Sequence, residues 1–97
     1  MRLRYTLPAL AELNAVLDHI EHHSPQGARR IQTRMKAIID LLLLHPYIGR
    51  RTEAPAIRRM TVSPYPYLIF YEVTETEIVI HAVRHGARDP SSMPGAF

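Results

Sequence analysis

Residues 67–83 read YLIFYEVTETEIVIHAV, and they contain two runs of branched and aromatic residues. The runs cover residues 67–73 and 77–83, and their composition is typical of β-strands. Only Thr74, Glu75 and Thr76 separate them. A connection this short predicts that the two strands pair as an antiparallel hairpin.

The residues before this hairpin predict one further strand and a loop. Residues 57–62 have the composition of a strand, although they include two arginines. Two prolines between residues 63 and 66 predict the turn into the next strand, because proline has no N–H to donate to a sheet. Residues 46–55 are predicted to form a loop because of their proline and glycine content.

The N-terminal half begins with a predicted strand and a helix. Residues 2–6 alternate polar and apolar side chains, and Leu7-Pro8 ends this strand. From Pro8 to His23 the apolar residues recur at spacings of three and four, which is the period of a helix. They are Leu10, Leu13, Leu17 and Ile20. The acidic residues of this helix are expected to face water: Glu12, Asp18 and Glu21.

A second helix is predicted from Ser24-Pro25, because serine caps a helix and proline suits its first turn. Its apolar residues keep the helical period up to His45, and Pro46 stops it. They are Ala28, Ile31, Met35, Ile38 and Leu42. The two helices should fold back on each other as a hairpin. The predicted fold class is therefore α+β, in the order β-α-α-β-β-β, with the helix hairpin packed on a mainly antiparallel sheet.

Length and composition set the domain organisation. A chain of 97 residues, 46% of them hydrophobic, is predicted to form one domain over residues 1–97. Residues 90–97 are predicted to be a flexible tail, since they contain two prolines and a glycine. The chain has no cysteine, which excludes disulfides and favours a cytoplasmic location. The longest apolar run, residues 38–44, is too short to span a membrane, so no membrane partner is expected.

Several kinds of catalytic site are not expected. The four glycines are scattered, so no phosphate-binding loop is predicted. Three of the six histidines lie near one helix end, and only His19 and His23 have a spacing suited to a shared metal ion. No metal site and no cofactor are predicted. The serines lie in predicted turns and in the tail, and no Ser/His/Asp arrangement stands out.

The remaining candidates are arginines and tyrosines. Eleven of the twelve basic residues are arginine, and the net charge is +3. The end of the last predicted strand, with Arg84 and His85, is expected to lie near Arg58. Such a patch would bind phosphates through arginine and stack bases on tyrosine. Alternatively, these arginines form exposed ion pairs with Glu53, Glu72, Glu75 and Glu77. They are Arg50, Arg51, Arg58, Arg59, Arg84 and Arg88.

Short motifs follow one another in an order that resembles a known family. They include residues 5–13 (YTLPALAEL), 45–51 (HPYIGRR), 57–60 (IRRM), 65–71 (YPYLIFY) and 83–90 (VRHGARDP). Together they resemble the ParE branch of the RelE/ParE family of toxins from bacterial toxin–antitoxin operons, which includes plasmid stabilisation proteins. The resemblance covers residues 2–90, and it implies the same β-α-α-β-β-β fold.

The resemblance implies one of two activities. ParE-like members are non-catalytic poisons that bind DNA gyrase, and RelE-like members cleave messenger RNA on the ribosome. Cleavage needs a base, an acid and cations around one phosphate. RelE-like relatives commonly have a Tyr or His in the tail, and residues 89–97 contain neither. We therefore expect a gyrase inhibitor without catalytic residues. The alternatives are a nuclease, for which the set would be His85, Arg58 and Arg88, or an inactive relative that only binds its antitoxin.

The resemblance also suggests binding surfaces. The residues expected to contact the target are Arg84, His85, Arg88, Asp89, Arg58 and Tyr67. A ParD-like antitoxin is expected to fold against an apolar groove beside the helix hairpin. Four apolar residues of the second helix lie outside its core stripe and indicate this groove: Ile39, Leu41, Leu43 and Leu44. The predicted contact set is Leu13 and Leu17 of the first helix with Ile39 and Leu43 of the second. The competing interpretation is that the first helix and the sheet cover both sides of the second helix. The partners expected are the antitoxin, in a higher-order hetero-oligomer with the toxin, and DNA gyrase; direct nucleic-acid binding is left open.

Overall fold

The computed structural model describes residues 1–86, which form two helices and one five-stranded sheet. Arg88, Asp89 and the predicted tail lie outside the described residues. The elements follow one another as β1 (Arg2–Tyr5), α1 (Leu7–His23), α2 (Pro25–Leu44), β2 (Arg50–Arg51), β3 (Ile57–Thr61), β4 (Tyr67–Val73) and β5 (Glu77–His85). The predicted α+β class and the order of the elements are confirmed.

Both helices begin at a capping side chain. The Thr6 hydroxyl accepts a hydrogen bond from the Ala9 N–H, and the Ser24 hydroxyl accepts one from the Gly27 N–H. The backbone N–H of Ser24 also donates to the Ile20 carbonyl at the end of α1. One serine therefore ends the first helix and begins the second, which makes the turn between them tight.

The strands are ordered β1-β5-β4-β3-β2. β1 pairs with β5 in parallel, and the other neighbours are antiparallel, so the predicted β4–β5 hairpin is confirmed. A register shift lies between Phe70 and Tyr71 of β4. The prediction that residues 46–55 form only a loop is wrong, because Arg50 and Arg51 pair with Arg59 and Arg58 across β3.

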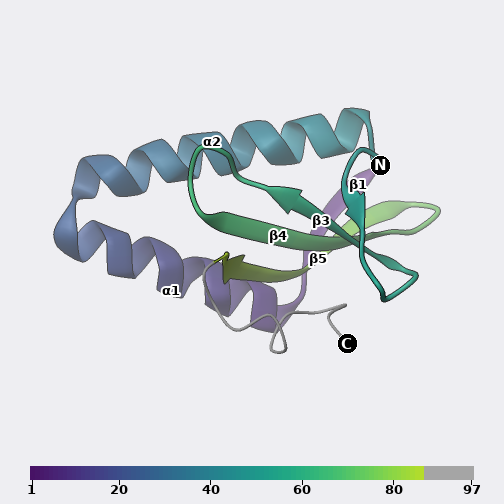
Figure 1. The fold of residues 1–97 in the computed structure, drawn as a ribbon, viewed down its shortest axis with the longest axis horizontal. Coiled ribbons are helices and arrows are strands. Elements are labelled where there is room, and N and C mark those ends of the chain that lie inside the picture. The colour runs from purple at the N-terminus through teal and green to yellow at the C-terminus, as the bar shows by residue number, and fades with distance from the viewer. Residues whose placement is uncertain (87–97) are drawn as a thin grey trace.

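The two helices cover one face of the sheet, as Figure 1 shows. Their hairpin buries the predicted stripe of α2, including Ile31, Met35 and Leu42, against Ile69 and Tyr71 of β4. In α1 the prediction is only partly right. Leu10 is 42% exposed, and the buried position is Ala9, which is 0% exposed.

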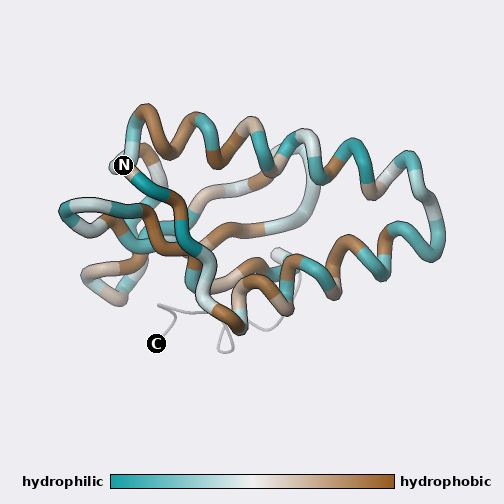
Figure 2. The backbone as a smooth tube through the Cα atoms, turned by 180° about the vertical axis from the view of Figure 1, so that it is seen from behind, coloured by the Kyte–Doolittle hydropathy of each residue, from teal (hydrophilic) through white to brown (hydrophobic). Residues whose placement is uncertain are grey.

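Hydropathy along the chain follows this layering, and Figure 2 shows strongly hydrophobic segments in the central strands and in the last turns of α2. Within residues 1–86, no helix has both the length and the apolar character that crossing a membrane requires.

Candidate functional site

Glu12 connects α1 to the edge of the sheet. β1 ends at Tyr5, opposite Ile80, so the last residues of β5 extend beyond it along that edge. There the Glu12 Oε1 atom accepts a hydrogen bond of 3.1 Å from the Val83 N–H. The expectation that Glu12 faces water is wrong, because a strand edge leaves a backbone donor that needs an acceptor.

The same carboxylate holds Arg84, one of the predicted target-binding residues. Glu12 Oε2 lies 2.8 Å from Arg84 Nε, and the Arg84 side chain is only 25% exposed. This contact is an ion pair without a hydrogen bond, because Nε has no partner at a hydrogen-bonding angle among the described residues. The Arg84 charge is thus compensated within the protein.

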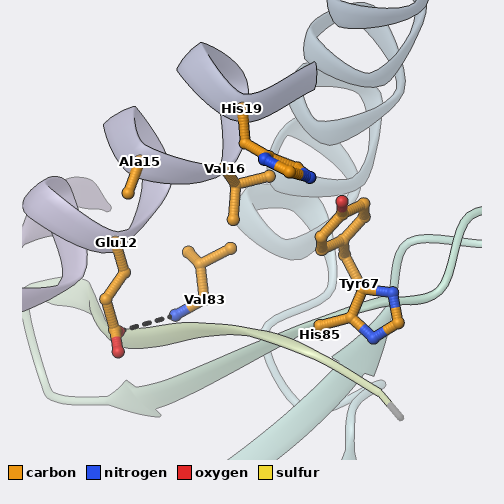
Figure 3. A pocket seen from close by; sticks show the side chains of 7 residues that line it. All are labelled: Glu12, Ala15, Val16, His19, Tyr67, Val83 and His85. Carbon is orange, nitrogen blue, oxygen red and sulfur yellow. Dashed lines mark hydrogen bonds between the residues drawn. The ribbon is translucent and has the colours of Figure 1, made fainter. Parts of the chain in front are cut away.

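A cleft of about 610 Å³ opens beside this contact, between α1 and the ends of β4 and β5. Figure 3 shows His19 of α1 and Tyr67 of β4 approaching from its two sides. Its lining residues are Glu12, Ala15, Val16, His19, Tyr67, Val83 and His85. The Tyr67 and His85 rings form an edge-to-face pair with centroids 5.3 Å apart. The structure therefore brings two of the predicted target-binding residues together.

Arg58 lies elsewhere. It is opposite Tyr71 in β4, whereas His85 is opposite Tyr67. Four residues of strand span about 13 Å, so the expectation that the end of the last strand lies near Arg58 is wrong. The two prolines before β4 predict a turn, but they do not predict the register of β3 with β4, which sets the distance between Arg58 and His85.

The Arg58 side chain binds the loop before β2. Its guanidinium donates to the carbonyls of Tyr47 and Gly49, at 3.1 and 3.0 Å, and lies 5.2 Å from the centroid of the Tyr47 ring. The proposed alternative for the arginines is not observed either. Within residues 1–86, no carboxylate forms an ion pair with the arginines of β2 and β3, since Glu77 binds Arg4 and Glu72 binds His81.

A buried tyrosine binds the same loop. The Tyr71 hydroxyl donates to the Pro46 carbonyl and accepts from the Gly49 N–H, both at 2.8 Å. Burial raises the pKa of this phenol, against smaller opposite effects of the Gly49 N–H and the Arg58 charge. Gly49 has no room for a side chain, because a Cβ there would overlap the Tyr71 ring. The proline and glycine content of residues 46–55 predicted a loop here, but it gave no sign of this contact with Tyr71.

The predicted antitoxin-binding residues do meet in one place. Leu13 and Leu17 of α1 line a groove of about 340 Å³ together with Ile39 and Leu43 of α2. Leu3 and Tyr5 of β1 form its third side, and burial raises the pKa of the Tyr5 phenol. Ile39 is 8% exposed, so it contributes mainly to the floor. The expectation that Leu41 and Leu44 also mark this groove is wrong, because neither lines it and they are 39% and 74% exposed elsewhere on α2.

The histidines of α1 form a small group on its last turns. The His19 and His23 rings are 5.1 Å apart, and His22 lies next to His23. Among residues 1–86, no three side chains of the His, Cys, Asp and Glu types are grouped so that they could hold a metal ion.

Comparison with known proteins agrees with this architecture. The chain is 39% identical over 84 residues to the toxin RelE2 of Caulobacter vibrioides. The aligned residues cover 87% of this chain and 93% of that protein. Among solved structures, it is similar to a chain of the chromosomal ParDE TA system from P. aeruginosa, with a TM-score of 0.75 and 26% identity over 88% of this chain and 95% of that chain.

YafQ from E. coli shares the fold, with a TM-score of 0.60 at 14% identity over 90% of this chain and 96% of that chain. The family model that describes the ParE toxin of type II toxin–antitoxin systems, parDE, matches residues 3–90. The chain therefore belongs to the ParE toxin family of type II toxin–antitoxin systems, within the RelE/ParE superfamily.

Proposed function

We propose that this toxin acts by binding DNA gyrase and trapping it, without making or breaking bonds itself, and that a ParD-like antitoxin neutralises it. An antitoxin partner follows from membership of the family. The choice of gyrase over messenger RNA rests on one observation, the separation of His85 from Arg58, whose partners in β4 lie four residues apart.

That separation matters because RNA cleavage needs several groups around one phosphate. A base, an acid and a cation must all reach the reacting atoms within hydrogen-bonding distance. Arg58 faces the carbonyls of Tyr47 and Gly49 at the other end of the sheet from His85. Arg84, the cation next to His85 in the chain, is paired with Glu12. These contacts favour a surface that binds over a site that cleaves.

The groove between β1 and the helix hairpin suits the antitoxin. A short amphipathic helix places apolar residues on one face, and a groove lined by leucine and isoleucine side chains from three elements can accept that face. Lys36 and Asp40 flank the groove and bind each other at 3.3 Å, so the two charges at its edge are matched. We assign the predicted residues Leu13, Leu17, Ile39 and Leu43 to this contact.

The test compares the two activities on one preparation. Purified toxin is incubated with gyrase and relaxed plasmid, and separately with ribosomes translating a defined message. We expect loss of supercoiling and accumulation of cleaved DNA–gyrase complex, both reversed by antitoxin, with the message intact. Cleavage of the message that the His85→Ala variant abolishes would overturn the proposal. So would a toxin that leaves both gyrase and message unaffected.

A further inference from the structure

The end of α2 and the loop after it expose a group of large apolar side chains. Leu41 is 39% exposed, Leu44 74%, Tyr47 66% and Ile48 45%. These four residues, which we name the apolar corner, follow one another within eight positions of the chain. Figure 2 shows the hydrophobic last turns of α2 that lead into the corner. Exposed apolar groups gathered in this way mark interaction surfaces more often than scattered ones do.

The corner is held in place by hydrogen bonds from two side chains of the sheet, Tyr71 and Arg58. The Tyr71 side chain is 0% exposed, and its hydroxyl fixes the loop at the Pro46 carbonyl and the Gly49 N–H. Arg58 fixes the carbonyls on either side of Ile48. The backbone that carries Tyr47 and Ile48 is therefore anchored from inside while their side chains face outward. A surface fixed in advance loses little conformational entropy on binding.

Arginines border the corner. Arg50 and Arg51 follow directly in β2 and are exposed. Within the described part of the chain, neither forms an ion pair with a carboxylate. Tyrosine and arginine are enriched at the centres of protein interfaces, where an apolar anchor is surrounded by polar groups. The complementary surface is an apolar pocket bordered by carboxylates.

The corner and the antitoxin groove use different sides of α2. Ile39 and Leu43 line the groove, whereas Leu41 and Leu44 are exposed and absent from its lining. Successive residues of a helix are turned by about 100°, so Leu41, two residues from both Ile39 and Leu43, lies on nearly the opposite side of α2. Leu44 follows Leu43 directly and is turned from it by about 100°. The groove and the corner are thus available as separate contacts.

We propose that the apolar corner is the surface by which the toxin grips its target protein, through an apolar pocket of gyrase bordered by acidic side chains. This inference rests on the proposed function, because it names the contact that gyrase would make. A second copy of the chain fits less well, since a two-fold contact through the corner would bring Arg50 and Arg51 of both copies together.

The experiment measures the affinity of the full-length toxin for purified, DNA-free gyrase by surface plasmon resonance. The test variant is Tyr47→Ala combined with Ile48→Ser. The matched control is Leu7→Ser, which removes an even more exposed apolar side chain, 83% exposed, from the start of α1. Affinity for the antitoxin and the melting temperature are measured for all three proteins.

We expect the double variant to lose at least about 30-fold in affinity for gyrase, which is the effect of removing an interface hot spot. The control variant should stay within about 3-fold of the wild type, and antitoxin affinity should be unchanged in both. Unchanged binding of the double variant to gyrase would overturn the inference and leave the proposed function standing. A wild-type toxin that binds gyrase neither in the absence nor in the presence of DNA would overturn the proposed function, and the inference with it.

Two further results would also contradict the inference. One is binding that requires DNA, because arginines would then be contacting phosphates. The other is a wild-type dimer that the double variant converts to a monomer, because the corner would then contact a second copy. Charge reversal gives an independent arm: Arg50→Glu with Arg51→Glu should lower the association rate and its dependence on salt.

Discussion

Glu12 on α1 accepts a hydrogen bond from the backbone N–H of Val83 on β5, with 3.1 Å between Oε1 and the nitrogen. The contact joins residues 71 positions apart and lies just beyond the end of β1. A carboxylate thereby replaces the missing strand, satisfies an edge donor and makes that edge less able to pair with another chain.

We predict that Glu12→Ala lowers the free energy of unfolding by about 1–3 kcal/mol, because it leaves the Val83 N–H without its acceptor and Arg84 without its counter-charge. Glu12→Gln keeps an oxygen for Val83 and loses only the ion pair, so its cost should be smaller, up to about 1 kcal/mol. Urea denaturation measures both. Equal stability of the alanine variant and the wild type would contradict the role given to this carboxylate.

Tyr71→Phe is predicted to destabilise the protein by about 1–3 kcal/mol, since the Pro46 carbonyl and the Gly49 N–H both lose a partner. The hydroxyl is the only group removed, so the ring packing is preserved. The second consequence is local, because Tyr47 and Ile48 would no longer be fixed from inside. Denaturation measures the first effect, and amide hydrogen exchange at residues 47–51 measures the second. Protection of that loop equal to wild type would contradict the anchoring role.

The same residue predicts a dependence on pH. Burial raises the pKa of Tyr71 above its ordinary value of 10.0, so the folded protein holds this proton more tightly than the unfolded chain. The resulting stabilisation is complete below pH 10 and is lost as the pH rises through the folded-state pKa. Tyr5 shifts in the same direction. The free energy of unfolding should fall between about pH 9 and about pH 12, the range in which tyrosines lose their proton. Tyr71→Phe should make this fall smaller without abolishing it, because Tyr5 remains.

Gly49→Ala is predicted to be more damaging than its single methyl group suggests. A Cβ at this position would lie 2.3 Å from the Tyr71 hydroxyl oxygen and 2.6 Å from its ring, so the loop and the ring must separate. Overpacking of this kind costs about 1–3 kcal/mol. The comparison variant is Gly86→Ala at an exposed position, where the nearest atom to the added Cβ, the Pro66 carbonyl oxygen, lies at 3.3 Å, so a smaller displacement is enough. Thermal denaturation should place this variant between the wild type and Gly49→Ala; the reverse ranking would contradict the close approach of Gly49 to Tyr71.

The parts of the fold that sequence analysis predicted depend on local chemistry. The β4–β5 hairpin follows from two runs of strand-forming residues and a short link, and Ser24 ends one helix and caps the next. β2 was missed because Arg50 and Arg51 have no strand pattern of their own, and they pair only because β3 offers an edge. The apolar surplus of α2 pointed to a groove, and Leu13, Leu17, Ile39 and Leu43 do meet in one, but the surplus alone could not tell that Leu41 and Leu44 lie outside its lining.

The parts that sequence analysis missed depend on register and on contacts between distant residues. Glu12 occupies a position that helical spacing assigns to solvent, and only the place where β1 ends gives it a backbone partner. Arg58 was expected near the end of the last strand on an assumed strand pairing, but the observed register places Arg58 opposite Tyr71 and His85 opposite Tyr67, four residues apart along β4. Local sequence patterns cannot predict either relationship, because the partner of each residue depends on the register with which the strands pair.

The groove gives the last prediction, which concerns the antitoxin. Leu17 lines the groove and Leu10 does not, although both lie on α1, so Leu17→Asp and Leu10→Asp form a matched pair. A carboxylate at position 17 would lose its water when an apolar partner covers it, which costs several kcal/mol unless a cation is supplied. We expect Leu17→Asp to weaken antitoxin binding by at least about 100-fold in titration calorimetry. Leu10→Asp should stay within about 3-fold of the wild type, because that side chain does not line the groove and is already 42% exposed. Leu43→Asp tests the opposite wall of the groove from α2. If both wall variants fold with unchanged melting temperatures and bind the antitoxin as tightly as the wild type, the antitoxin occupies another face of the toxin.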